Sequence, residues 1–382
     1  MTFETLSEGW VTLRQPGTPT AIAAGPRCAV TKEGDVVCSF MVQSQLGVND
    51  FKPMLARSQD GGRTWSEGQL LWPHLKDRYS IFGSVSRAPN GDLFYYGIQF
   101  PIETPGETFW SDATQGMKAN ELIWSRSDSG RTWAEPAVIP MPIPGAAEAP
   151  GALTVMRSGR MICCYAPYNT FDPQLVVDRN QIVAVRSDDQ GRTWRYNSVI
   201  RFESEYSTGA EAWVIELADG RLLGTAWHMN QQDKSDHPNA YAISLDRGDT
   251  WQPTRSTGIM GQSTALAALP DGRALFIYNQ RKHGEPGVWM AVVKPTENDF
   301  GVESNEIVWR AQTRTQSGSS GEHSEWTDFS FGEPSVTLLP AKTLRLRSEL
   351  ALNAVKGQAL LVVFWCVQPA GQGIRYARLM FR

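Results

Sequence analysis

Short apolar runs, each entered through a polar turn that contains glycine, recur along the whole chain. One copy reads Leu217-Ala218-Asp219-Gly220-Arg221-Leu222, and an apolar run follows it. Further copies lie at residues 31–37, 88–93, 156–161 and 269–274, with a weaker sixth copy at 354–360. Short apolar runs bounded by Gly, Asp and Asn are typical of strands that tight hairpins connect. The pattern therefore predicts an all-β chain with six hairpins, each between a first and a second strand.

A second repeat ends in Thr-Trp and follows the pattern S-x-D-x-G-x-T-W. It occupies residues 58–65, 126–133, 187–194 and 244–251, and in this alignment only the second copy lacks the leading Ser. An Asp side chain can accept hydrogen bonds from backbone N–H groups in a tight turn, and Gly permits positive φ. The spacing of about 60 residues suits one four-stranded unit with its loops. Each copy is thus expected to join a third to a fourth strand, with a structural and not a catalytic Asp.

This repeat resembles the Asp box, or BNR repeat, of the sialidase (neuraminidase) superfamily, and the resemblance covers nearly the whole chain as architecture. It implies one six-bladed β-propeller with four-stranded antiparallel blades. The expected blade cores are residues 24–72, 80–139, 148–200, 209–256, 261–338 and 347–382, with residues 8–15 as the outer strand that closes the last blade. In the fifth blade, residues 331–336 are expected to form the outer strand and to place Glu333 on the surface. Closing the ring in this way removes exposed sheet edges.

Composition and charge limit the function classes. The formal net charge is −4 and no run of Lys or Arg occurs, which argues against nucleic acid as a partner. No apolar stretch reaches the length of a membrane span, and residues 1–8 lack the pattern of a signal peptide, so a cytoplasmic location is expected. A secreted mature form is not excluded by this reasoning. Oligomeric state stays open.

The sequence also bears on metals and cofactors. The five cysteines are odd in number, and at least three lie in apolar runs such as residues 161–165. We therefore expect buried, reduced thiols and no zinc site. No motif requires a cofactor, so neither a cofactor nor a metal is expected.

The predicted topology selects one face for function. The starts of the first strands and the loops from second to third strands share a face, and the Asp boxes lie on the other. Polar, non-repeating loops on a rigid scaffold commonly carry function. The loops concerned are residues 41–53, 97–120, 166–180, 227–239, 279–287 and 366–373.

The sialidase resemblance implies an Arg cluster that binds a substrate carboxylate, an Asp acid/base, and a Tyr nucleophile that a Glu activates. Asp50 lies ten residues before the first box Asp and matches the acid/base. Glu211, at the inner start of a blade-four strand, matches the activating Glu. Arg27 opens the first strand of blade one, where the family has its first arginine.

Two positions depart from the family pattern. The family has another arginine of its cluster where this chain has residues 226–230. It has its Tyr nucleophile where this chain has residues 347–350, Arg-Ser-Glu-Leu. Glu349 is therefore a third catalytic candidate. The other candidates for substrate binding lie in face loops or at strand starts, and they are Arg78, Tyr79, Tyr168, His228, Arg281 and Arg347.

Together these residues predict an exo-acting glycoside hydrolase for an acidic or polyhydroxylated sugar. Asp50 would be the acid/base and Glu211 the second carboxylate or activator. One alternative is a propeller that binds carbohydrate without catalysis. Another is a polysaccharide lyase, in which His228 or a Tyr would remove a proton beside a uronate carboxylate.

Overall fold

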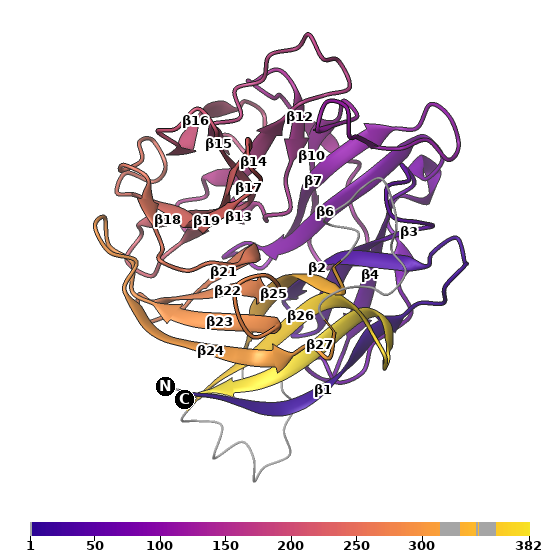
Figure 1. The fold of residues 1–382 in the computed structure, drawn as a ribbon. Coiled ribbons are helices and arrows are strands. Elements are labelled where there is room, and N and C mark those ends of the chain that lie inside the picture. The colour runs from indigo at the N-terminus through magenta and orange to yellow at the C-terminus, as the bar shows by residue number, and fades with distance from the viewer. Residues whose placement is uncertain (1, 314–328, 341–342, 344–356) are drawn as a thin grey trace.

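Six small antiparallel sheets surround a central axis as the blades of a propeller (Figure 1). This computed structural model describes residues 2–313, 329–340, 343 and 357–382. The all-β fold class, the six blades and the four-stranded antiparallel blade predicted from the repeats are confirmed.

Each blade has an inner strand at the axis and three strands stacked outward from it. The strands from inside to outside are β2 (Ile22–Val30), β3 (Val36–Gln43), β4 (Lys52–Ser58) and β5 (Gln69–Leu70) in blade one; β6 (Tyr79–Arg87), β7 (Leu93–Pro101), β10 (Glu121–Ser127) and β11 (Ala137–Ile139) in blade two; β12 (Ala146–Glu148) with β13 (Thr154–Val155), then β14 (Met161–Tyr168), β15 (Gln181–Ser187) and β16 (Arg195–Arg201) in blade three; β17 (Ser207–Glu216), β18 (Leu222–Asn230), β19 (Asp236–Ser244) and β20 (Arg255–Ser256) in blade four; β21 (Gln262–Ala268), β22 (Ala274–Gln280), β23 (Gly287–Val293) and β24 (Val302–Arg310) in blade five; and β25 (Phe331–Leu339), β26 (Gln358–Gln368), β27 (Gly371–Phe381) and β1 (Phe3–Leu13) in blade six. A short 3₁₀ helix, η1 (Pro73–Leu75), follows blade one, and a small hairpin, β8 (Trp110–Ser111) with β9 (Gly116–Met117), projects from blade two.

The N-terminal strand β1 closes the ring. It pairs antiparallel with β27, with Phe3 opposite Phe381 and Leu13 opposite Gly373. The outer place in blade six, expected for residues 8–15, is thus occupied by a strand that begins earlier, at Phe3. The N and C termini lie side by side in Figure 1.

The boundary between blades five and six differs from the expected one. Strand β24 is the outer strand of blade five, whereas residues 331–336 belong to β25, the inner strand of blade six. Phe331 is fully buried, as a strand beside the axis requires. The expectation rested on the likeness of residues 331–336 to residues 133–138, which follow the second Asp box, and this likeness indicated the wrong blade. The expected start of blade six at residue 347 lies outside the described residues.

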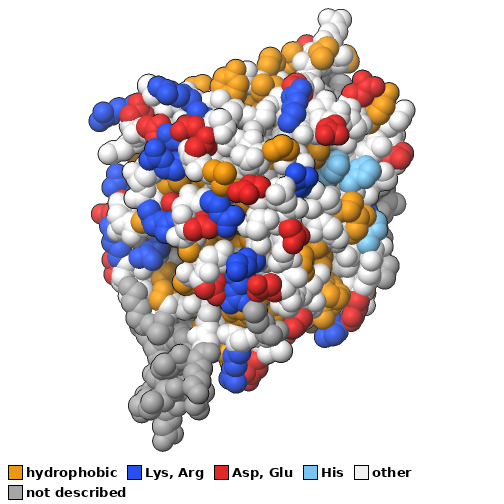
Figure 2. All heavy atoms as spheres, turned by 90° about the vertical axis from the view of Figure 1, so that its left-hand side faces the viewer, with side chains coloured by type: hydrophobic (Ala, Val, Ile, Leu, Met, Phe, Trp, Pro, Cys, Tyr) orange, Lys and Arg blue, Asp and Glu red, His pale blue; other side chains and the backbone are white. Residues whose placement is uncertain are grey.

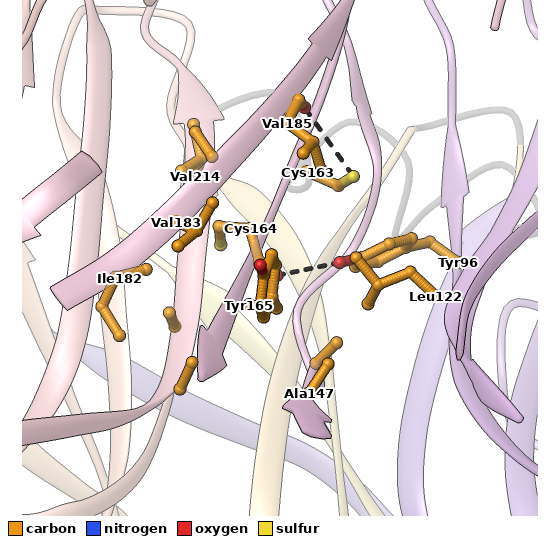
Figure 3. Close-up of a cluster of buried hydrophobic side chains, with 14 of the residues drawn as sticks. Tyr96, Leu122, Ala147, Cys163, Cys164, Tyr165, Ile182, Val183, Val185 and Val214 are labelled. Carbon is orange, nitrogen blue, oxygen red and sulfur yellow. Dashed lines mark hydrogen bonds between the residues drawn. The ribbon is translucent and has the colours of Figure 1, made fainter. Parts of the chain in front are cut away.

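The blades pack against one another through apolar sheet faces. Figure 3 shows part of this packing, a buried cluster to which blades two, three and four contribute Leu122, Ile182 and Val214. The Tyr96 hydroxyl donates to the backbone oxygen of Cys164 at 3.1 Å and so links blades two and three. All five cysteines are buried and free, as the apolar runs predict.

The outer surface carries charges of both signs. On the side shown in Figure 2, basic and acidic side chains are interspersed. Among the described residues, no helix has the length and apolar character needed to cross a membrane.

The Asp boxes join third and fourth strands in blades one to four, as predicted. In blade one, Asp60 accepts hydrogen bonds from Arg63 N (3.0 Å), Thr64 N (2.9 Å), Thr64 Oγ1 (2.7 Å) and Ser58 Oγ (2.8 Å). These bonds hold the turn shut and engage both carboxylate oxygens. The carboxylate is therefore structural.

The box of blade two is one residue shorter, and the alignment that leaves it without a Ser is wrong. Ser127 ends β10 as Ser58 ends β4, and its hydroxyl accepts Gly130 N–H at 2.7 Å. Ser129 therefore occupies the place of the box Asp, and Asp128 lies exposed beside it.

These contrasting boxes generate a stability prediction. Asp60→Ala removes four hydrogen bonds to a carboxylate, so it should lower the melting temperature by at least about 2 °C in differential scanning calorimetry. Asp128→Ala is the matched control and should change it by less than about 1 °C. Equal effects of the two substitutions would contradict the structural role of the box Asp.

Candidate active site

A cavity of about 470 Å³ opens at one end of the propeller axis. Residues from all six blades line it, and each of the six face loops predicted from the sequence contributes at least one of them. The Asp boxes lie at the opposite ends of the strands. The cavity is therefore on the face that the topology selects for function.

The inner strands of four blades are bulged where they reach this cavity. Gly25, Glu211, Ser263 and Glu333 each stand at a register shift, with φ of 62°, 52°, 51° and 48°. In a bulge two residues oppose one on the partner strand, which changes the direction of a side chain. Positive φ is uncommon for residues other than Gly. The repeated bulge therefore places one side chain at the cavity in each of blades four, five and six, and these are Glu211, Ser263 and Glu333.

Of the described residues, three glutamates line the cavity, and each is hydrogen-bonded to a neighbouring blade. Glu148 Oε2 accepts the Glu211 backbone N–H at 2.8 Å, which joins blades three and four. Glu333 Oε2 accepts the Gly25 N–H at 2.7 Å, which joins blades six and one. Glu211 Oε1 accepts the Ser263 hydroxyl at 2.5 Å, which joins blades four and five. The carboxylates thus converge from blades three, four and six.

The burial of these carboxylates favours their protonated forms. Burial raises the pKa of Glu148 to about 8, and the charge of nearby Glu211 adds to this rise. Burial raises the pKa of Glu211 to about 7, although the Ser263 hydrogen bond opposes it. Burial also raises the pKa of Glu333, against the opposing charge of Arg27. Because like charges this close disfavour simultaneous ionisation, the cluster retains a proton near neutral pH.

Two buried arginines offset the remaining negative charge. Arg27 is 3% exposed, and its Nη1 donates to the backbone oxygens of Pro26 (2.8 Å) and Glu333 (3.0 Å). Arg281 is 7% exposed and lines the cavity, and burial lowers its pKa to about 10. Burial also lowers the pKa of Arg27, against the opposing charges of Glu333 and Glu211. Both guanidinium groups stay charged at neutral pH, because arginine does not lose its proton in proteins. The structure thus brings together Arg27, Arg281 and Glu211 of the residues predicted from the sequence.

Arg179 and Tyr168 form a further part of the wall. The Arg179 guanidinium carbon lies 4.7 Å from the centre of the Tyr168 ring. Burial lowers the pKa of Arg179 and raises that of the Tyr168 hydroxyl. Within the described ranges, no carboxylate forms an ion pair with Arg179, whose guanidinium therefore retains donors for a ligand. Tyr168 was predicted as a site residue, and Arg179 was not.

Arg27 contacts Glu333 but does not line the cavity, and three further predicted residues from blades one and two are also absent from the lining. The Asp50 carboxylate accepts the Ser44 N–H at 3.2 and 3.3 Å, which closes its own loop. Arg78 is exposed and lies over the ring of Tyr79, 5.5 Å from its centre. Tyr79 packs beside the apolar cluster of blades one and two.

His228 also points away from the cavity. Its ring stacks on Phe202, with 4.4 Å between centres, and its Nε2 lies 2.9 Å from Ser207 Oγ. Successive side chains of a strand point to opposite faces, and the neighbours Trp227 and Met229 are the ones that line the cavity. Burial lowers the pKa of His228 to about 4. The histidine is therefore uncharged at neutral pH.

The last two predicted residues, Arg347 and Glu349, lie outside the described residues. Because blade six begins with β25, its inner-strand start carries Glu333. The family's Tyr nucleophile was expected at that place. Glu333 is thus a cavity residue, and its expected position on the surface is wrong.

Glu148 and Glu333 were missed although short repeats mark them. Ala147-Glu148-Ala149 repeats Ala210-Glu211-Ala212, and Glu333-Pro334 matches Gly25-Pro26 at the equivalent bulge. For Arg179, in the long loop between β14 and β15, we find no such signal. Among the described residues, no group of His, Cys, Asp and Glu is arranged to hold a metal ion.

The raised pKa of Glu148 generates a prediction about stability. The folded-state pKa of the Glu148 carboxyl lies above its usual value of 4.5, so its protonated form stabilises the folded state at low pH. This stabilisation is lost as pH rises through about 8. Glu148→Gln does not ionise and keeps an acceptor oxygen for Glu211 N–H. Its melting temperature relative to wild type should therefore rise between pH 5 and pH 9 by at least about 3 °C.

Thermal denaturation at both pH values tests this expectation. Glu67→Gln, at an exposed site, is the matched control and should show no such trend. A constant difference between Glu148→Gln and wild type would mean that Glu148 ionises normally.

Comparisons with known proteins agree with this architecture. The sequence model of the family described as "BNR repeat-like domain" matches residues 99–358. A sialidase of Micromonospora viridifaciens is 26% identical over 275 residues, which make up 65% of this chain and 39% of that protein. The chain thus spans about two fifths of the length of the curated sialidases that it matches.

Solved structures show the same fold. A protein of unknown function from Dyadobacter fermentans DSM 18053 aligns with a TM-score of 0.75 at 20% identity, over 100% of this chain and 99% of that chain. The Hadza microbial sialidase Hz136 aligns with a TM-score of 0.66 at 16% identity, over 97% of this chain and 68% of that chain. At these identities the likeness shows the fold alone. Because the family model covers more than half of the sequence and the relatives include sialidases, the chain belongs to the BNR repeat-like domain family of the sialidase superfamily.

Proposed function

We propose that the protein hydrolyses a glycosidic bond of an acidic sugar in the central cavity. The observation that carries this proposal is the convergence of Glu148, Glu211 and Glu333 in a site that keeps one of them protonated near neutral pH. Glycoside hydrolysis commonly uses one protonated and one ionised carboxyl group beside the scissile bond. The cluster supplies both forms.

Glu148 is the proton donor in this proposal. Its pKa of about 8 keeps it protonated at neutral pH, so it can protonate the oxygen of the leaving group. It belongs to blade three, directly opposite blade six in the ring. A substrate at the axis would therefore lie between Glu148 and Glu333.

Glu333 is the ionised partner. Burial raises its pKa, whereas the charges of Arg27 and Arg281 and the Gly25 N–H oppose this rise and favour the carboxylate form that the proposal requires. It either attacks the anomeric carbon or activates a water molecule, and the stereochemistry of the product distinguishes these roles. Glu333 takes the role that the sequence-based hypothesis gave to Glu211 as second carboxylate. Glu148 takes the role of Asp50, whose carboxylate is bound within its own loop.

Glu211 positions and tunes the proton donor. Its backbone N–H holds Glu148 Oε2, and its charge adds to the burial that raises the Glu148 pKa. It thereby acts through Glu148.

Arg179 supports an acidic sugar as the substrate. Its guanidinium lines the cavity without an ion-pair partner among the described residues, and Arg281 lines the same wall of blades three to five. A guanidinium binds a carboxylate bidentately. A sugar carboxylate would compensate this positive charge.

A panel of fluorogenic glycosides of uronic acids, sialic acids and the matched neutral sugars tests the proposal. We expect release from an acidic glycoside, a fall of at least ~100-fold in kcat for Glu148→Gln and Glu333→Gln, and less than ~3-fold change for Asp50→Asn. Arg179→Gln should remove the preference for the acidic sugar and raise KM.

Other outcomes would overturn the proposal. Loss of activity in Asp50→Asn but not in Glu148→Gln would restore Asp50 as the acid/base. No release, with binding still detected by a thermal shift, would identify a non-catalytic carbohydrate-binding propeller. An unsaturated product would identify a lyase.

The tuning of Glu148 predicts a specific pH dependence. Because the donor must be protonated, kcat/KM should fall as pH rises through about 8. Glu211→Gln removes the charge that helps to raise this pKa, so the falling limb should move to lower pH in a pH–rate profile. An unmoved limb would exclude the tuning role of Glu211.

A further inference from the structure

The central cavity has two chemically different halves. Blades three to five contribute charged side chains, among them Glu148, Arg179, Glu211, Arg281 and Lys282. Blades one and two and their loops contribute a mostly apolar wall, which includes Ile22, Met41, Leu46, Phe82, Ile98 and Phe109. Asp112 also lines this half, and its carboxylate accepts the Trp110 indole N–H at 2.9 Å. A sugar with many hydroxyl groups fits the first half and not the second.

The apolar wall is aromatic and fixed in place. Phe51 lies 4.8 Å from Phe109 and 6.0 Å from Phe100 between ring centres, both in edge-to-face geometry. The hairpin β8–β9, which carries Trp110, is held from both sides. Bridges join Val48 to Thr108 and Gly116 to Asn169, which tie the hairpin region to the loops of blades one and three.

The polar side chains beside this wall are already engaged with the protein. Three amide side chains donate to backbone oxygens: Gln43 to Val48 (3.0 Å), Gln115 to Asp112 (3.0 Å) and Gln372 to Ala21 (3.0 Å). A hydroxyl group buried here without a hydrogen bond would lose its hydration at a cost in free energy. The wall therefore disfavours a second sugar ring.

We infer that the substrate is a glycoside with an aromatic, non-sugar aglycone, which packs on the Phe wall of blades one and two while the acidic sugar faces Arg179. This inference rests on the proposed hydrolysis. Aromatic groups prefer edge-to-face packing such as this wall offers, and they gain free energy when buried in it. Glu148 of blade three neighbours blade two, because Ser84 Oγ donates to the Pro150 oxygen at 2.7 Å. The proton donor thus stands beside the aglycone half.

The reaction balances as a hydrolysis. The bond between the anomeric carbon and the aglycone oxygen breaks, and the aglycone leaves as an alcohol or phenol with the proton of Glu148. Water supplies the hydroxyl group on the anomeric carbon and a proton that restores Glu148.

The experiment compares leaving groups of similar acidity on the acidic sugar that the panel selects. These are the 2-phenylethyl glycoside, the methyl glycoside and a disaccharide. We expect kcat/KM for the 2-phenylethyl glycoside to exceed that for the other two by at least ~10-fold, the gain from burying one phenyl ring. Leu46→Gln, a half-buried residue of the wall, should reduce this advantage by at least ~3-fold. Leu245→Gln, 55% exposed in the Asp box of blade four, is the matched control and should not.

Equal or faster turnover of the disaccharide would overturn the inference. If no glycoside is hydrolysed, the proposed function fails, and calorimetry with 2-phenylethyl and methyl thioglycosides of glucuronic acid and of a sialic acid tests the inference separately. At least ~10-fold tighter binding of the 2-phenylethyl compound, weakened by Leu46→Gln, would support the aromatic subsite. Equal affinities, or no binding of either compound, would overturn it.

Discussion

Six inner strands that begin at one axis bring their first side chains into a small space, and burial there is costly for any charged group. This chain nevertheless places three glutamates and two arginines at that point. The cost is reduced because Glu148 and Glu333 each accept a backbone N–H from the next blade, and Arg27 donates to the backbone of Glu333. The glutamates therefore join the blades at the same place where they line the cavity. Stability and chemistry at the axis depend on the same few hydrogen bonds.

The bulge repeated in four inner strands shows how one scaffold changes its chemistry. The same strained position carries Gly25, Glu211, Ser263 and Glu333 in different blades. Where the residue is Gly, the position supplies only an N–H to a neighbour. Where the residue is Glu, it supplies a carboxylate. Exchange of one side chain at a fixed backbone position thus suffices to redistribute acids around the axis without a change of fold.

The sequence was informative wherever a repeat marks a turn. The hairpin glycines and Asp boxes identified the blades, and the position of Glu211 before its turn identified a true cavity residue. The likeness of residues 331–336 to the segment after the second Asp box hid the boundary of blade six, so Glu333 was assigned to the surface. Asp50 has the spacing of a family acid, but spacing does not determine which way a loop carboxylate points. His228 is absent from the cavity lining for a different reason. Adjacent side chains of a strand point to opposite faces of the sheet, and its neighbours Trp227 and Met229 are the ones that face the cavity.

The pairing of β1 with β27 has a mechanical consequence. Phe3 lies opposite Phe381, so both chain ends emerge at the same end of one antiparallel ladder. A force that pulls the two ends apart would load the hydrogen bonds of this ladder one after another and not all at once. The ring would therefore open by peeling of its N-terminal strand at low force, whereas the same ladder pulled along its length would resist as a unit.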